Sequence, residues 1–350
     1  MKLKKIISPL NVIAKITEVR LFNKIRLLNV NFSVTSRCNL NCKYCWRGEI
    51  SKNNNHNFPD EMKLVQIKKA FHNLRELYAE VINITGGEPL VREDISEIIR
   101  AGLKDNLWVS LTTNGVLLTQ RLKEIDEVKL LIVSLDGKKE SNDSLRGEGT
   151  FLKVIKGIEL SKNLGVPLML SCVISAKTQN EDIDFLLNLA KFYEIYCIFH
   201  PVNDRGIVND KWEVNSNIKK VKTEKNELIN KLNYLKNHQL INKSCGGKYW
   251  CELMKEFQEK QEILKNKLCF GGRLFVNIES NGVVTSCGLS QDPLLRDRIF
   301  DQGFLENYQL AVRRISCKGC FCYSYKMIND ISKFNLRTIK NFLIQDKFKY

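Results

Sequence analysis

Three cysteines near the beginning of the chain have the residue type and spacing of an iron–sulfur site. Cys38, Cys42 and Cys45 stand in the order C-x3-C-x2-C. Three thiolates this close in sequence can ligate three irons of a 4Fe–4S cube and leave the fourth iron open to a small molecule. A cluster held by four cysteines has no open iron, so the trio predicts binding and activation of a ligand rather than electron transfer alone.

Zinc is the main alternative for these thiols, because structural zinc sites are also built from cysteine and histidine. Such a site usually closes with a fourth ligand at short spacing. The next histidine, His56, lies in the polar run 51–56, which is typical of a loop. The sequence therefore favours the cluster over zinc and over an accidental trio of structural cysteines.

Three further motifs follow the cysteines in a fixed order. Gly-Gly-Glu-Pro occupies 86–89, Thr-Thr-Asn-Gly 112–115 and Ser-Leu-Asp-Gly 134–137, and Tyr44 precedes the third cysteine. This ordered set, with the C-x3-C-x2-C trio, resembles the signature of the radical S-adenosylmethionine (SAM) superfamily. The resemblance covers roughly residues 28–205. It implies reductive cleavage of SAM to a 5′-deoxyadenosyl radical, which abstracts hydrogen from a substrate carbon.

The resemblance also implies how the cysteine loop is used. Cys38, Cys42 and Cys45 would hold a 4Fe–4S cluster, with the amino and carboxylate groups of SAM on its open iron. Tyr44 would lie against the adenine of SAM.

Two later motifs are expected to contact SAM. Glycine lets the backbone come close to a ligand, so Gly86 and Gly87, with Glu88, can accept from an ammonium group. By resemblance they receive the methionine amino group, and the alternative is a glycine turn with a capping glutamate. Ser134 and Asp136 carry the oxygen acceptors that a ribose needs, although Asp136 can instead stabilise the glycine turn that follows it.

Four further positions each have a functional and a structural interpretation. Arg146 can pair with the methionine carboxylate in bidentate fashion, or be a surface arginine. Val173 and Ile174 can contact adenine, although strand packing is the default for such residues. His200 is expected to be a hydrogen-bonded structural histidine in preference to a substrate-facing one.

A second group of cysteines lies in the last third of the chain. Cys269 and Cys287 flank a predicted β-hairpin around Ser-Asn-Gly, and Cys317 and Cys320 follow as C-x2-C. Four thiolates so placed can close around a second cluster. The arrangement resembles the SPASM/twitch extension of radical SAM enzymes, in the shorter, twitch-like form with one auxiliary [4Fe–4S] cluster. A zinc ribbon is the structural alternative.

The remaining cysteines have less defined roles. Cys322 can replace a ligand, donate a hydrogen atom to a substrate radical, or be a spare thiol. The roles of Cys245 and Cys251 stay open. Cys172 and Cys197 lie in strand-like runs and are expected to be small buried hydrophobes.

Strand-like and helical runs alternate from residue 28 onwards. Strands are expected at 28–34, 81–85, 108–112, 130–134, 167–174 and 195–199, and helices at 62–78, 95–103, 119–125, 151–164 and 181–193. This alternation implies parallel strands with right-handed crossovers. The predicted fold is therefore α/β, a partial (β/α)6 TIM-like barrel, with ligand-binding motifs at the carboxyl ends of its strands.

The chain divides into five predicted segments. These are an amphipathic helical segment (1–27), a radical SAM core (28–205), a helical connector (206–266), an auxiliary module of β-hairpin plus helix (267–322) and a basic end (323–350). The first segment is expected to pack on the barrel in preference to a membrane surface. The auxiliary hairpin is predicted from strand-like runs at 274–279 and 283–286.

Bulk composition limits the class of protein. The 350 residues are 43% hydrophobic and include 12 cysteines, without a run of about eighteen apolar residues. The first residues are basic, but the apolar run that follows them is interrupted, which argues against a cleaved secretory signal. Clustered cysteines in such a chain favour iron–sulfur ligation in a reducing cytoplasm over a disulfide framework. The net charge of +16 is spread along the chain, which argues against specific nucleic-acid binding and leaves an anionic substrate or a peripheral membrane contact open.

The leading functional hypothesis is oxidative modification of a peptide or protein side chain, which is widespread among SPASM/twitch relatives. Only 37 residues precede Cys38, too few for a leader-binding domain, so a separate peptide-recognition protein is expected, or none. An electron donor such as flavodoxin or ferredoxin is implied. Tailoring of a small molecule, sugar or lipid precursor is the alternative within enzymes. A non-catalytic iron–sulfur redox sensor or scaffold is the alternative outside them.

Overall fold

The computed structural model describes most of the chain. The described residues are 9–45, 60–202, 205–208, 211–214, 223–260, 270–287, 293–295 and 297–312.

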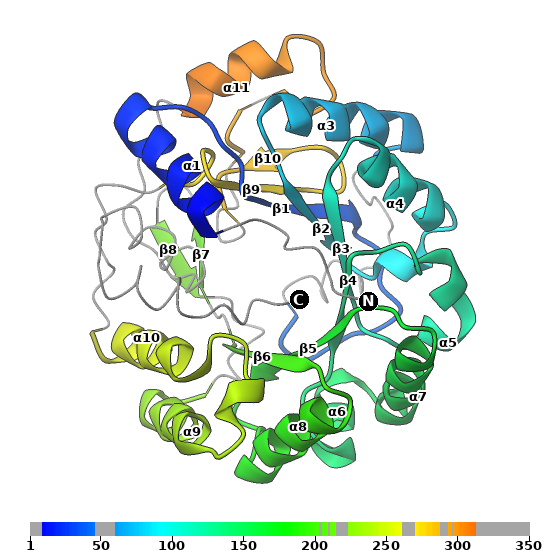
Figure 1. Ribbon diagram of the computed structural model, residues 1–350, viewed down its shortest axis with the longest axis vertical. Helices are drawn as coiled ribbons and strands as arrows, with labels where there is room; N and C mark the ends of the chain where they lie inside the picture. Colours follow the sequence, from blue (N-terminus) through cyan, green and yellow to red (C-terminus); the bar gives the residue numbers. More distant parts are fainter. Residues whose placement is uncertain are drawn as a thin grey trace.

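Six parallel strands form the centre of the fold, as the sequence predicts. They are β1 (Asn29–Thr35), β2 (Val81–Gly86), β3 (Trp108–Thr113), β4 (Leu130–Ser134), β5 (Leu168–Ile174) and β6 (Tyr196–Pro201). Each pairs in parallel with the next, so their order in the sheet follows the chain. Figure 1 shows them curving into an incomplete ring, and the partial barrel is confirmed.

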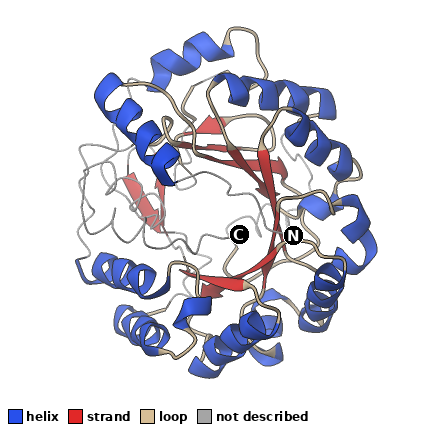
Figure 2. Cartoon of the chain, in the orientation of Figure 1, coloured by secondary structure: helices blue, strands red, loops and turns tan. Residues whose placement is uncertain are grey.

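Helices cover the outside of this ring (Figure 2). They are α3 (Leu64–Glu76), η1 (Pro89–Val91), α4 (Ile95–Lys104), α5 (Leu118–Arg121), η2 (Leu122–Glu124), α6 (Lys139–Arg146), α7 (Thr150–Asn163) and α8 (Asn180–Phe192). The predicted helical runs are confirmed to within a few residues. The helix α6 was not predicted, because its sequence, Lys-Glu-Ser-Asn-Asp-Ser-Leu-Arg, contains one apolar residue and therefore no apolar periodicity.

The two faces of the barrel sheet carry different side chains, because successive strand residues point to opposite faces. Phe32 and Ile84 are fully buried in the hydrophobic core under the helices. Burial of one such side chain contributes about 1.5–3 kcal/mol. On the other face Asn31 accepts from the Asn83 amide at 3.4 Å, and Ser110 donates to Asn83 at 3.2 Å. The inner face of the ring is therefore partly polar.

The predicted C-terminal hairpin is confirmed, and it extends the barrel sheet. It consists of β9 (Phe275–Ile278), parallel to β1, and β10 (Val284–Thr285), antiparallel to β9. The sheet therefore has eight strands, in the order β10-β9-β1-β2-β3-β4-β5-β6. The hairpin turn also reaches the cysteine loop, since the buried hydroxyls of Ser280 and Ser36 are 2.7 Å apart. The boundaries of a separate auxiliary module stay a prediction.

The N-terminal helix α1 (Pro9–Phe22) packs on the barrel, as expected. Its Ile16 and Val19 are buried, and Lys15 forms an ion pair with Glu80 beside β2. These contacts support packing over the membrane-surface alternative.

The predicted helical connector contains the helices α9 (Lys225–Asn237) and α10 (Gly247–Lys260), separated by η4 (Ile241–Lys243). The small two-stranded sheet of β7 (Arg205–Val208) and β8 (Lys211–Val214) was not predicted, and α11 (Phe304–Val312) follows the hairpin β9–β10. Among the helices in the described ranges, none is both long enough and apolar enough to span a membrane.

We expect Asn73→Ala to loosen the attachment of the C-terminal segment to the barrel. The buried Asn73 amide donates to the Ile299 carbonyl at 2.6 Å, and its loss leaves that carbonyl unpaired. The expected cost is about 1–3 kcal/mol in the free energy of unfolding, measured by urea titration. Asn188→Ala is the control, because Asn188 donates to the carbonyl of Asp184 at an exposed position. Equal effects of the two substitutions would show that the contact with Ile299 contributes nothing.

Candidate functional site

The first two motifs meet at the carboxyl ends of β1 and β2. The Gly87 N–H donates to the Thr35 carbonyl at 2.8 Å, and the Glu88 N–H donates to the Arg37 carbonyl at 2.8 Å. Gly86 lies opposite Thr35 in the register of the two strands. The Gly-Gly-Glu-Pro turn is therefore attached to the backbone that leads directly into Cys38.

Both glycines of this turn are required by the approach of the two backbones. Gly86 has a φ of +133°, and a Cβ there would lie 2.2 Å from the Thr35 carbonyl oxygen. A Cβ on Gly87 would lie 2.1 Å from the Arg37 carbonyl oxygen. The sequence predicted close approach of these glycines to SAM. The structure shows close approach to the cysteine loop, and the predicted contact with the methionine amino group stays a prediction.

Glu88 joins the second motif to the third. Its fully buried carboxylate accepts from the Thr113 hydroxyl at 2.7 Å, the Asn114 N–H at 2.6 Å and the Leu90 N–H at 3.1 Å. Burial raises the pKa of Glu88 to about 7, against the opposite effect of these hydrogen bonds. The contacts match the capping alternative, and Glu88 as an acceptor for the SAM amino group stays a prediction.

The three cysteines stand in one loop, and each of them is half-buried. The Cys45 N–H donates to the Cys42 carbonyl at 3.0 Å. Burial raises the pKa of Cys42 to about 12; the Arg146 charge lowers it, and the Cys45 and Cys38 thiolates raise it further. The Cys38 sulfur accepts from the Leu40 N–H at 3.4 Å and lies 3.9 Å from the Asn114 amide.

These residues fit a 4Fe–4S cluster. Backbone and amide N–H groups already point at the Cys38 sulfur, as a thiolate ligand requires, and iron would displace the thiol protons. Within the described ranges, no three His, Cys, Asp or Glu side chains converge on a single metal ion. A four-iron cube holds its cysteines at separate corners, further apart than the ligands of one ion.

Tyr44, Asp136 and Arg146 were predicted to contact different parts of SAM, and the structure brings them together. The Tyr44 hydroxyl donates to Asp136 Oδ2 at 2.6 Å, and Arg146 Nε donates to the same oxygen at 2.7 Å. Asp136 is 0% exposed and the Arg146 side chain 6%, so the interpretation of Arg146 as a surface arginine is wrong. The predicted contacts of the three residues with SAM stay predictions.

The other predicted residues of the fourth and fifth strands lie on both faces of the sheet. Ser134 is half-buried at the end of β4, opposite Ser171 of β5. Ile174 is 0% exposed within the hydrophobic core, and its half-buried neighbour Val173 lies on the other face of β5. The burial of Ile174 matches the strand-packing interpretation, and its predicted contact with adenine stays a prediction.

His200 is partly buried at the end of β6. Its ring meets the Trp250 ring edge to face, with 6.2 Å between centroids. Burial lowers the pKa of His200 to about 4, so the imidazole is neutral.

Most of the cysteines predicted to hold the auxiliary cluster are not among the described residues. Cys269, Cys317, Cys320 and Cys322 lie outside the described residues. Cys287 is half-buried at the end of the hairpin, where its carbonyl accepts from the Thr285 hydroxyl at 3.1 Å.

The other cysteines lie elsewhere in the barrel and the connector. Cys172 and Cys197 are buried in β5 and β6, as predicted, and Cys251 is buried in α10. The half-buried Cys245 donates its N–H to the Cys197 carbonyl at 2.8 Å.

Sequence reasoning missed the residues that support the start of the cysteine loop. Glu61 accepts from the Thr35 hydroxyl and the Ser36 N–H, both at 2.7 Å. Asn114 belongs to a recognised motif but was given no role, although its amide donates to the Asn39 side chain at 2.7 Å. No motif surrounds Glu61, so the sequence held no signal for it.

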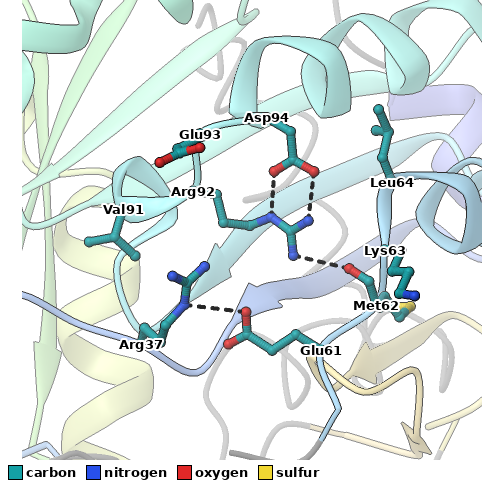
Figure 3. A pocket seen from close by; sticks show the side chains of 9 residues that line it. All are labelled: Arg37, Glu61, Met62, Lys63, Leu64, Val91, Arg92, Glu93 and Asp94. Carbon is teal, nitrogen blue, oxygen red and sulfur yellow. Dashed lines mark hydrogen bonds and ion pairs between the residues drawn. The ribbon is translucent and has the colours of Figure 1, made fainter.

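A pocket of about 540 Å³ lies beside this support (Figure 3). Arg92 forms two bonds with Asp94, at 2.8 and 2.7 Å, and donates to the Met62 carbonyl at 3.1 Å. Arg37 lies 3.5 Å from Glu61. The charged groups that line this pocket are thus largely paired with one another.

Comparison with known proteins identifies the class. Residues 32–190 match the model of the Radical SAM superfamily, so this part of the chain is a radical SAM domain. Members of that superfamily use SAM and a 4Fe–4S cluster.

Two curated relatives carry different named activities. The chain is 37% identical over 183 residues to the GTP 3′,8-cyclase of Clostridium botulinum (strain Okra / Type B1), covering 50% of this chain and 56% of that protein. It is 29% identical over 302 residues to the AdoMet-dependent heme synthase of Methanosarcina barkeri (strain Fusaro / DSM 804), covering 81% and 82%. The chain thus spans just over half the length of the cyclase.

The fold has a solved counterpart. SuiB of Streptococcus suis, bound to S-adenosylmethionine, superimposes with a TM-score of 0.65 at 17% identity, over 91% of this chain and 78% of SuiB. At this identity the likeness concerns the fold alone.

We expect Gly87→Ala to prevent assembly of the site. The added Cβ would collide with the Arg37 backbone, so the Gly-Gly-Glu-Pro turn must move away from the cysteine loop. Iron content after anaerobic reconstitution is expected to fall well below that of the wild type. The control is Gly165→Ala, where a Cβ meets open space and only the positive φ of +71° costs energy, roughly 1 kcal/mol. Full iron content in Gly87→Ala would contradict the packing role.

Glu88 should make stability depend on pH. Its pKa is raised from 4.5 to about 7, so the folded chain holds this proton more tightly than the unfolded chain does. The stability that it contributes is present below pH 4.5 and is lost as the pH rises through about 7. The difference in unfolding free energy between wild type and Glu88→Gln should therefore fall from roughly pH 5 to pH 8, measured on iron-free protein. Glu93→Gln, at an exposed position of the next turn, is the control, and a difference independent of pH would contradict the account.

Proposed function

We propose that the chain cleaves SAM reductively at a 4Fe–4S cluster held by Cys38, Cys42 and Cys45, and oxidatively modifies a substrate. The observation that carries the proposal is the attachment of the cysteine loop to the next two motifs through Gly87 and Glu88. When bound, cluster and SAM supply a 5′-deoxyadenosyl radical, which takes hydrogen from an unactivated carbon.

The chain's own residues orient these groups. Asn114 donates toward the Cys38 sulfur, while Glu88 holds the Asn114 backbone in place. The Ser134 hydroxyl forms no hydrogen bond with the other described residues, so it is available to a ribose hydroxyl. The Asp136 carboxylate already accepts from Tyr44 and Arg146. In its proposed role it would accept from a ribose hydroxyl in addition to these bonds.

An auxiliary [4Fe–4S] cluster at Cys269, Cys287, Cys317 and Cys320 belongs to this proposal. The hairpin that ends at Cys287 supports it, because β9 pairs with β1, the strand that leads into the first cluster loop. Such a cluster would accept the electron that remains on the substrate after hydrogen abstraction, which makes the net change an oxidation. A zinc ribbon at the same cysteines is the alternative.

The substrate we propose first is a peptide or protein side chain. SuiB, which shares the fold, has been crystallised with its precursor peptide SuiA. An electron donor such as flavodoxin or ferredoxin, and a separate peptide-recognition protein, would complete the system.

Tailoring of a small molecule is the second candidate. The relative that aligns over 81% of this chain is named a heme synthase, and the cyclase is named for GTP. A substrate of this kind needs no peptide-recognition partner.

We expect about eight irons per chain after anaerobic reconstitution, and formation of 5′-deoxyadenosine from SAM with dithionite. Replacing Cys38, Cys42 and Cys45 together by Ala should leave about four irons and abolish deoxyadenosine. Cys172→Ala is the control, because it removes a buried thiol far from both cysteine groups in sequence. It should keep the iron content and the deoxyadenosine formation of the wild type.

Other outcomes separate the alternatives. About four irons and one zinc in the wild type would reduce the C-terminal cysteines to a structural ribbon. Tight SAM binding without any cleavage on reduction would favour the non-catalytic sensor or scaffold.

A further inference from the structure

A buried ion pair, formed by Asp136 and Arg146, is in contact with the cysteine loop. Asp136 follows β4, and Arg146 is the last residue of α6. Arg146 donates from Nε to Asp136 Oδ2 at 2.7 Å and from Nη2 to Oδ1 at 3.3 Å, a bidentate pair. The Val173 N–H donates to Oδ1 at 2.9 Å. The pair is therefore fixed to β4, β5 and α6 together.

The two residues between the second and third cysteines bond to Asp136 and to the residue that precedes Arg146. The Tyr44 hydroxyl donates to Asp136 Oδ2 at 2.6 Å, and the Lys43 N–H donates to the Leu145 carbonyl at 2.9 Å. The Arg146 guanidinium lies 5.5 Å from the centre of the Tyr44 ring. Lys43 and Tyr44 stand between Cys42 and Cys45, so these bonds connect the ion pair to the backbone that carries both thiols.

The two charges of the pair lie beside the residues that join Cys42 to Cys45, because Asp136 accepts from Tyr44 and Lys43 is bonded to the residue before Arg146. Both side chains are almost fully buried, so water and salt screen these charges weakly.

We infer that Asp136 and Arg146 are positioning residues that set the electrostatic potential at the side of the cluster that Cys42 and Cys45 would hold, with the Tyr44 hydroxyl holding the loop against them. This inference rests on the proposed function, because it needs a cluster at the three cysteines. Reduction adds one electron to the cluster. A nearby positive charge favours the reduced form, and a nearby negative charge favours the oxidised form.

The bonds of Arg146 distinguish this role from direct binding of the SAM carboxylate. Two of its nitrogens already face Asp136, and removing either partner leaves a buried charge unpaired. The electrostatic role predicts opposite effects of the two removals on cluster reduction, already in the absence of SAM. A purely structural role predicts effects in the same direction.

The test measures the midpoint potential of the first cluster by electron paramagnetic resonance during a redox titration without SAM. It is done in chains whose C-terminal cysteines Cys269, Cys287, Cys317 and Cys320 are replaced by Ala, so that one cluster is observed. Arg146→Gln should lower the midpoint, Asp136→Asn should raise it, and the double variant should lie between them. Shifts of the same sign, or no shift in fully loaded variants, overturn the inference.

Tyr44→Phe tests the hydroxyl separately, because it changes no charge. The midpoint should stay near that of the wild type, while a chelator should extract iron about 3- to 10-fold faster, as expected for the loss of one hydrogen bond. Tyr234→Phe is the matched control, since Tyr234 donates to Asp184 at 2.7 Å between α9 and α8, and it should change neither quantity. Equal extraction rates in the two variants would contradict the role of Tyr44.

Iron uptake by the double variant and by the wild type decides the case in which the single variants bind no iron. If the single variants take up no iron, uptake restored in Asp136→Asn/Arg146→Gln supports a charge-balanced pair, and uptake still absent overturns it. A wild type that binds no iron at Cys38, Cys42 and Cys45 overturns the proposed function itself, which separates that failure from failure of the ion pair.

Discussion

The close approach of two backbones, at residues 35–37 and 86–88, is the constraint on which the site depends. Two N–H···O bonds join these segments, and each glycine of the turn lies where a side chain would collide with a carbonyl group. The Glu88 carboxylate extends the connection to the third motif through Thr113 and Asn114. Three loops from three strands thus behave as one unit, which gives the cysteine loop a fixed base before any cofactor binds.

The cysteine loop is also held by a hydrogen bond to a buried ion pair. The Asp136–Arg146 pair is buried, and Tyr44 reaches it from between two cysteines. A buried ion pair is costly to form without further hydrogen bonds, and here the Val173 N–H and the Tyr44 hydroxyl provide them. The partial barrel therefore holds the cysteine loop by backbone hydrogen bonds at the ends of β1–β3 and by a buried ion pair beside β4 and β5. The hairpin β9–β10 adds a third connection beside β1, through Ser280 and Ser36.

Much of this arrangement could be predicted from the sequence, because strand and helix periodicity is local. The bounds of β4 and the start of β2 agree with the apolar runs, and the order of the motifs places them at the strand ends. The sequence could not show which partner each polar group would find. Glu88 and Arg146 have the residue types of ligand contacts, yet their bonds go to Thr113 and Asp136, over separations that no local pattern encodes. The helix α6 escaped prediction because packing of Leu145 and the pairing of Arg146, rather than periodicity, hold it in place.

The central claim is that the three cysteines hold a cluster with one open iron that binds SAM. Electron–nuclear double resonance on the reduced protein, with SAM isotopically labelled at its amino nitrogen, tests this claim most directly. The account predicts a strong coupling between the labelled nitrogen and the cluster electron spin, as expected for direct coordination to iron. Absence of that coupling in a fully loaded, SAM-saturated protein would contradict it.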